Sequence, residues 1–231
     1  MTTATAPPSV RSRVAELAAV QIDGWQEGYL RDSPKDVAAL ARLRRGAGRD
    51  AADLPDLWTL VDTSPLHARL DGVRPLSEEE LVRAENALHA ALTLWAVHQQ
   101  SRGARMHRPH TRGRPGGPGG LGAAVRRLMP PDGIDEPVRK RLVRAGTAPG
   151  LTTLSQRLRD LIVLLRRADI PLDYGLLAGQ LYAWQWPGGA DAVRREWGRS
   201  FHSWQDPTAP ASAQGADGAA ARSDDRDKDA S

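Results

Sequence analysis

Apolar residues recur at helical spacing along most of the chain. The spacing matches the period of an amphipathic helix, in which positions three and four apart share one face. No stretch alternates apolar and polar residues over the length of a β-strand. The pattern therefore predicts an all-α protein. Its clearest apolar stripes consist of Leu81, Leu88, Leu92 and Trp95, and of Leu154, Leu158, Leu161 and Leu165.

Capping and stop signals place the ends of the predicted helices. Ser33 before Pro34 is a favourable pair for the N-cap and the first helical position, and Gly46 is a natural stop. Ser77 and Glu80 form a capping-box pattern at the start of a long helix. We predict a bundle of about eight or nine helices. They span 11–30, 34–45, 53–61, a long stretch that opens at Ser77, 121–129, 136–145, 153–168, 174–184 and 190–204.

Composition divides the chain into segments. Residues 11–101 and 121–204 form N-terminal and C-terminal helical halves. The Gly-, Pro- and Arg-rich loop 102–120 joins them, because its glycines and prolines cannot sustain a helix. We expect residues 1–10 to be a flexible N-terminus. Residues 205–231 contain no large apolar side chain and are expected to be a disordered tail.

The absence of cysteine excludes disulfide frameworks and thiolate metal sites, and it suits a reducing compartment. Residues 1–8 lack the basic patch and apolar core of a signal peptide. No window approaches the roughly 18 apolar residues of a membrane span. We therefore expect a cytoplasmic protein that does not associate with a membrane.

The charge is distributed unevenly along the chain. The formal net charge is +4, but residues 99–167 carry +11, whereas 1–98, 168–204 and 205–231 carry −3, −1 and −3. Lys140 is the only lysine in the basic stretch, and its other cations are arginines. Such a concentration of positive charge is typical of proteins that bind a polyanion.

Motifs for catalysis or cofactor binding are missing from the sequence. Gly117, Gly119 and Gly122 satisfy the G-x-G-x-x-G spacing, but the preceding strand and the later acidic residue of a dinucleotide site are absent. His107 and His110 lie in a loop expected to be mobile, without Cys or carboxylate neighbours to complete a metal site, so we expect them to extend the basic loop. No Walker lysine, nucleophile elbow or His-Glu-x-x-His motif occurs. We therefore expect that the protein is not an enzyme and that it binds neither a metal ion nor a cofactor.

The second predicted helix carries three arginines in defined positions. Its apolar stripe, which includes Val37 and Leu43, places Arg42 and Arg45 on the solvent face and Arg44 along the stripe. Taken alone, such a basic cluster is explained equally well by a helix face that is simply exposed to water and by a face that binds phosphate.

Helix 136–145 and the central loop also carry clusters of basic residues. In helix 136–145, Lys140, Arg141 and Arg144 share an arc turned away from the apolar Val138 and Leu142. Several basic clusters together favour phosphate binding over simple solvation. The candidate nucleic-acid-binding residues are Arg42, Arg44, Arg45, Arg102, Arg105, Arg108, Arg139, Lys140, Arg141, Arg144 and Arg159.

The seven tryptophans allow two interpretations. Single-strand binding proteins stack bases on such side chains. Helical apolar spacing instead favours core packing, which is the interpretation we adopt for Trp25, Trp58, Trp95, Trp184 and Trp197. For Trp186, just before Pro187, the spacing favours neither.

Four segments, in order along the chain, resemble one known family. They read DSPKDVAALARLRRGAG at 32–48, LTLWAVHQQ at 92–100, IPLDYGLLA at 170–178 and LYAWQWP at 181–187. Together they resemble CasB, the small subunit of Cascade, the type I-E CRISPR surveillance complex. The resemblance implies an all-helical protein without an active site, present as a pair along the belly of that complex. It places family-type arginines at Arg44, Arg45, Arg144 and Arg159, and the glycine-rich insertion 112–120 looks longer than is usual in the family.

The partners that the resemblance implies are guide RNA, target DNA, the displaced single strand, a second copy of the chain and other Cascade subunits. In such complexes guide pairing reads the sequence, so the protein needs only to follow the nucleic-acid backbone and stabilise the R-loop. Two other classes remain open. One is a free-standing helical DNA-binding regulator with a recognition helix after a short turn. The other is a helical nuclease or RNA-processing enzyme, which metal-dependent cleavage would reveal.

Overall fold

The computed structural model describes residues 9–68, 74–110 and 120–204, and every regular element in these ranges is helical. The expectations for residues 1–8, for 111–119 of the central loop and for the tail 205–231 lie outside the described residues. The prediction of an all-α fold is confirmed. The helices are α1 (Val10–Leu30), α2 (Pro34–Arg44), the 3-10 turns η1 (Ala51–Asp53) and η2 (Pro55–Leu57), α3 (Ser64–His67), α4 (Glu78–Gln99), α5 (Leu121–Arg126), α6 (Glu136–Gly146), α7 (Leu151–Arg167), α8 (Tyr174–Trp184) and α9 (Gly189–His202).

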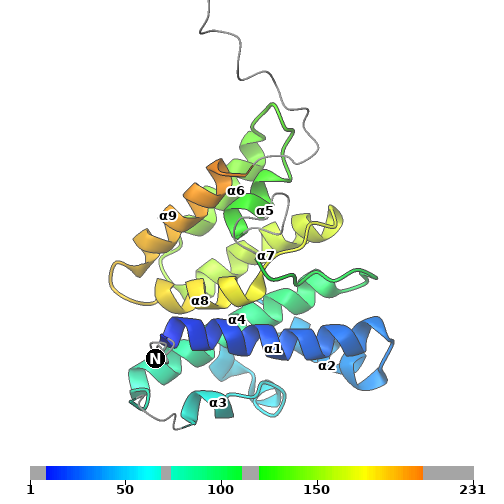
Figure 1. Cartoon of the computed structure of the whole chain (residues 1–231), viewed down its shortest axis with the longest axis vertical. Helices are drawn as coiled ribbons and strands as arrows, with labels where there is room; N and C mark the ends of the chain where they lie inside the picture. Colours follow the sequence, from blue (N-terminus) through cyan, green and yellow to red (C-terminus); the bar gives the residue numbers. More distant parts are fainter. Residues whose placement is uncertain (1–8, 69–73, 111–119, 205–231) are drawn as a thin grey trace, which may run out of the picture.

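Helix α8 lies at the centre of the packing, against α1 and α4 (Figure 1). Nearly every residue of α8 is buried, as expected for a helix with apolar or small residues on all sides. Gly175 and Gly179 let its backbone approach α1, because a Cβ added to either would lie 2.8 and 3.1 Å from the carbonyl oxygens of Ala15 and Arg11. Helices α5, α6, α7 and α9 form the upper part in Figure 1, where α5 packs on α9 and α6 on α7.

The predicted capping box is present, and two further helices have caps that the sequence analysis did not predict. Ser77 is the N-cap of α4, its Oγ accepts from the Glu80 backbone N–H, and the Glu80 carboxylate accepts from the Ser77 N–H, so the capping box is confirmed. Asp135 and Asp173 cap α6 and α8 by accepting from backbone N–H groups 3.0 and 2.8 Å away. Ser33 is the N-cap of α2, although its side chain makes no capping hydrogen bond.

The predicted helix 53–61 is wrong. The segment contains the 3-10 turn η2 instead, and the short helix α3 follows it. Leu54 precedes Pro55 and has a non-helical conformation, with φ −133° and ψ 64°, because the proline ring disfavours the α conformation in the preceding residue. The predicted helix therefore cannot run through Leu54, and only the short turn η2 forms after it.

The first part of the central loop is packed, which corrects the expectation that it is mobile. Met106 and His107 are buried, and residues 106–108 form a parallel bridge with Leu172 just before α8. Gln26 of α1 bonds both backbone groups of His107, at 2.8 and 3.2 Å. Gln99 likewise accepts from the Met106 N–H at 3.0 Å. Long polar side chains from two helices thus satisfy the backbone groups of a buried irregular segment.

Candidate nucleic-acid interface

An open groove of about 710 Å³ lies where α2, α6 and α7 approach one another. Six arginines and one aspartate line it, so its charge is strongly positive. Three of these arginines come from α2 and the turn after it, one from α6 and two from α7. The lining residues are Arg44, Arg45, Ala47, Gly48, Arg49, Arg144, Thr153, Gln156, Arg157, Arg159 and Asp160.

The turn after α2 forms the first wall. Leu40 and Leu43 are buried and anchor α2 in the core, whereas the expected stripe residue Val37 is 40% exposed. The chain then turns through hydrogen bonds from the Arg45 and Gly46 N–H groups to the last turn of α2. Gly48 has a φ of +83°, a left-handed conformation that glycine adopts without strain.

Helices α6 and α7 form the other two walls, and side chains of α7 connect the three walls. Gln156 donates its amide N–H to the Gly48 carbonyl oxygen at 3.2 Å, which ties the turn to α7. The Arg157 guanidinium donates to the Arg144 carbonyl oxygen and so ties the end of α6 to the same helix. Arg157 and Arg49 were not among the sequence candidates, since neither lies in a basic cluster on a predicted helix face. Only the packing of distant helices places them in the groove.

The most exposed groove arginines have no carboxylate partner. Arg45, Arg144 and Arg159 are exposed, Arg44 is half-buried, and none forms an ion pair with another described residue. Like charges held together repel one another, and an anion in the groove relieves that repulsion. The guanidinium fork is suited to phosphate oxygens, which it can contact through two parallel hydrogen bonds.

Other candidate arginines already have partners. Arg102 pairs with Asp169 at 3.0 Å and Arg105 with Asp23 at 3.3 Å. Arg139 forms two hydrogen bonds with Glu136, and the guanidinium of Arg42 donates to the Asp56 carbonyl oxygen. Arg42 is therefore half-buried and not fully turned to solvent as expected. The remaining candidates, Arg108, Lys140 and Arg141, are exposed.

One histidine of the central loop, His107, does not extend a basic surface as expected. His107 is buried, burial lowers its pKa, and its Nδ1 accepts from the Tyr174 N–H at 3.1 Å. The His110 backbone N–H donates to the Asp173 carboxylate at 2.7 Å. Among the residues that the structure describes, no group of three or more His, Cys, Asp or Glu is arranged to hold a metal ion.

The tryptophan prediction is confirmed with one exception. Trp95, Trp184 and Trp197 are buried, and Trp25 stacks on Trp95 with ring centroids 6.2 Å apart. Trp58, which directly follows η2, is 67% exposed. Trp186, which the spacing left open, is half-buried under the guanidinium of Arg83, 3.8 Å from its ring centroid.

Comparisons with known proteins agree with this architecture. The model of the CRISPR-associated protein Cse2 family matches residues 39–202. The crystal structure of CasB from Thermobifida fusca is similar at a TM-score of 0.71 and 49% sequence identity, over 83% of this chain and 98% of that chain. No curated protein gives a significant match.

Two further solved chains share the fold at lower identity. One belongs to a structure described as a CRISPR RNA-guided surveillance complex and the other to one described as the same kind of complex, pre-nicking. Both have TM-scores of 0.56, with 21% and 19% identity, and they cover 82% of this chain and 95% and 96% of their own chains.

Fold and groove together define an all-helical protein with an arginine-lined surface. The chain belongs to the Cse2 family, also called CasB, the non-catalytic small subunit of the type I-E Cascade surveillance complex. Of the helices in the described ranges, none is long and apolar enough to cross a membrane.

Proposed function

We propose that this subunit binds the backbone of guide RNA and target DNA in the arginine groove and thereby stabilises the R-loop during antiviral defence. The observation that supports it is the convergence of Arg44, Arg45, Arg144 and Arg159 on one groove. Arg44 and Arg45 lie about one hundred positions before Arg144 and Arg159 in the chain. They are also the four positions at which the resemblance to CasB places family-type arginines.

The energetics of strand exchange make such a contact decisive. A guide–target duplex replaces a DNA duplex of similar stability, so opening is nearly balanced and backbone contacts can tip it. A charge-assisted hydrogen bond contributes on the order of 1 kcal/mol. Three or four such contacts would therefore change target affinity by about two powers of ten or more. Arginines that contact phosphates carry no base preference, and guide pairing supplies the sequence specificity.

The proposal includes the setting in which the groove works. The chain would act in the cytoplasm as one of a pair of copies, beside the other Cascade subunits and in contact with the displaced single strand. The relatives from RNA-guided surveillance complexes support this assembly.

The test compares two triple variants of equal charge change in a reconstituted complex. The groove variant R45A/R144A/R159A removes three exposed arginines without ion-pair partners, and the control R31A/R105A/R139A removes three that are paired with carboxylates. We expect the groove variant to lose about 100-fold in affinity for matched and mismatched targets alike, with a shallower salt dependence. The control should lose much less, and guide processing should remain intact in both. Equal affinities of the groove variant and the unaltered protein would refute the proposal, as would cleavage of nucleic acid by the isolated chain.

A further inference from the structure

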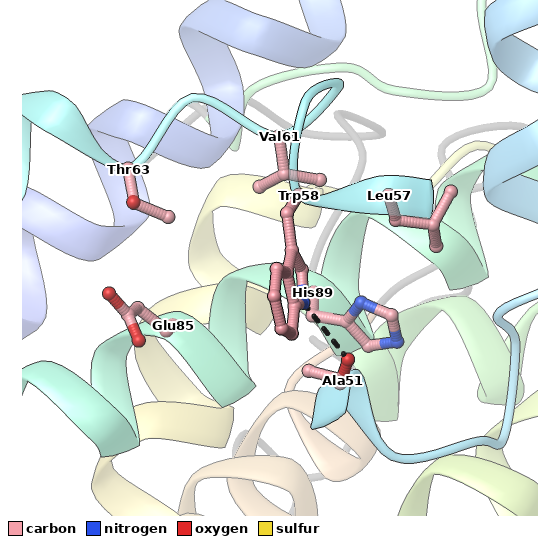
Figure 2. A pocket seen from close by; sticks show the side chains of 7 residues that line it. All are labelled: Ala51, Leu57, Trp58, Val61, Thr63, Glu85 and His89. Atoms are coloured by element: carbon pink, nitrogen blue, oxygen red, sulfur yellow. Dashed lines mark hydrogen bonds between the residues drawn. The ribbon is translucent and has the colours of Figure 1, made fainter. Parts of the chain in front are cut away.

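A second cavity lies just beyond the arginine groove, and an exposed tryptophan forms one side of it. Trp58 follows η2 with 67% of its surface exposed, and the cavity has a volume of about 240 Å³. Figure 2 shows the indole ring standing between the Glu85 and Thr63 side chains and the imidazole of His89. The lining residues are Ala51, Leu57, Trp58, Val61, Thr63, Glu85 and His89.

The indole ring is held in place although it is exposed. Its Nε1–H donates to the Ala51 carbonyl oxygen at 3.4 Å, as the dashed line in Figure 2 marks. The neighbouring Leu57 is buried, and the Asp56 carbonyl oxygen accepts from Arg42 of α2. A preplaced aromatic face loses little conformational freedom when a ligand stacks on it.

A buried polar atom lies on the same cavity. His89 of α4 is only 6% exposed, and its Nε2 makes no close hydrogen bond among the described residues, although the backbone of Gly46 and Arg49 lies near the ring and partly offsets the effect of burial on its pKa. Burial lowers the pKa of His89, so the ring is neutral near pH 7. A buried polar atom without a partner is unfavourable and is satisfied by a ligand that brings a complementary group. Glu85 is half-buried on the other side of the indole; its Oε1 lies 3.4 Å from His67 Nε2, and its second carboxylate oxygen is available as an acceptor.

The cavity and the groove adjoin along the backbone. Arg49 lines the groove and Ala51 lines the cavity, so the two begin within about 7 Å of each other along the chain. Gly46, which lies between the groove residues Arg45 and Ala47, also packs against the cavity residues Leu57 and His89. A Cβ added to Gly46 would lie 2.9 Å from Leu57 and 3.2 Å from His89. A strand with its phosphates in the groove would therefore pass close to the indole face.

We propose that this cavity binds one unstacked nucleobase of the strand that lies in the arginine groove. Trp58 stacks on the face of the base, and His89 hydrogen-bonds its edge. The site requires a ligand with a flat apolar face, polar edge atoms and an attached anion, and a nucleotide of a single strand has all three. This inference rests on the proposed function of the groove and adds to it a subsite that contacts bases.

The test uses the full chain and two single-stranded probes of equal length, a deoxythymidine oligomer and an abasic sugar-phosphate oligomer. The W58A protein loses one base-stacking contact, so it should bind the deoxythymidine oligomer roughly 5- to 100-fold more weakly than the unaltered protein. The W58F protein keeps an aromatic face and should bind with nearly unaltered affinity. Binding of the abasic oligomer should be the same for all three proteins. The salt slope should not change with W58A, since no phosphate contact is removed.

Two control variants separate the possible failures. V20A removes an apolar side chain that is 64% exposed on α1 and should change neither probe's affinity. If R45A/R144A/R159A weakens binding and W58A does not, the base subsite is refuted and the groove proposal stands. Equal losses of W58A on both probes would show a merely structural role, and loss of Cascade assembly alone would show a protein-docking surface. Either result would overturn the inference. Unchanged binding by the groove variant would refute the proposed function itself.

Discussion

Gly122 of α5 lies directly against the backbone of Trp197 in α9: a Cβ added to Gly122 would be 1.9 Å from the Trp197 carbonyl oxygen. Trp197 cannot easily move away. Its ring stacks on Trp184 with centroids 5.6 Å apart, and its Nε1–H donates to the Gln180 side chain at 2.8 Å. The last glycine of the G-x-G-x-x-G spacing is thus explained by close packing of two helices.

We expect Gly122→Ala to destabilise the protein by about 3 kcal/mol or more, since the methyl group must displace backbone and not a flexible side chain. Urea unfolding measures the change. Gly198→Ala is the matched control, because α9 has nothing within 4 Å of a Cβ at that position. That variant should be neutral or more stable by up to about 1 kcal/mol. A G122A protein as stable as G198A would contradict the packing described here.

Stability should fall as the pH decreases from about 6.5, because His98 is buried in neutral form. Its Nδ1 lies 2.9 Å from the Tyr174 hydroxyl, and burial, aided by Arg166 and Arg102, lowers its pKa from 6.5 to about 3. Between these two values the unfolded chain binds more protons than the folded one, so the free energy of unfolding decreases with falling pH.

The variant His98→Gln should reduce that pH dependence, whatever its effect on stability at pH 7. Denaturant unfolding from pH 7 to pH 4 measures the slope for each protein. His202→Gln, at an exposed position of α9, should retain the slope of the unaltered protein. If H98Q and the unaltered protein have the same slope, protonation of His98 is not coupled to unfolding.

Two arginines of α6 should differ in their contribution to nucleic-acid binding. Arg141 is exposed, whereas Arg139 is held by two hydrogen bonds to Glu136, which raise the pKa of Arg139. A phosphate must displace that carboxylate before it can bind Arg139. We expect R141A to lower the salt slope of single-strand binding by about 0.7, the value of one phosphate contact, and R139A to lower it less. Equal slopes for the two variants would show that the ion pair has no influence.

The basic segment and the helical elements could be predicted from the sequence because their causes are local. The capping box of Ser77 and Glu80 acts within one turn, and α8 begins and ends at the predicted residues 174 and 184. The arc formed by Lys140, Arg141 and Arg144 also follows from helical geometry alone, and all three are exposed as expected. A local cause also accounts for the start of the wrongly predicted helix 53–61, since the residue before Pro55 has a non-helical conformation.

Which arginines line the same groove was decided by the tertiary structure. Charge counts along the chain treat Arg102 and Arg144 alike, but packing places Asp169 beside Arg102 and leaves Arg144 in the groove without a carboxylate partner. Arg45 and Arg159 line the same groove because the turn after α2 lies beside α7, where Gln156 donates to the Gly48 carbonyl oxygen. Helical periodicity determines which face of one helix a side chain occupies, and it carries no information about which distant helix covers that face. The sequence by itself therefore determined most of the helices and the excess of arginine, whereas the groove depends on contacts between helices far apart in the chain.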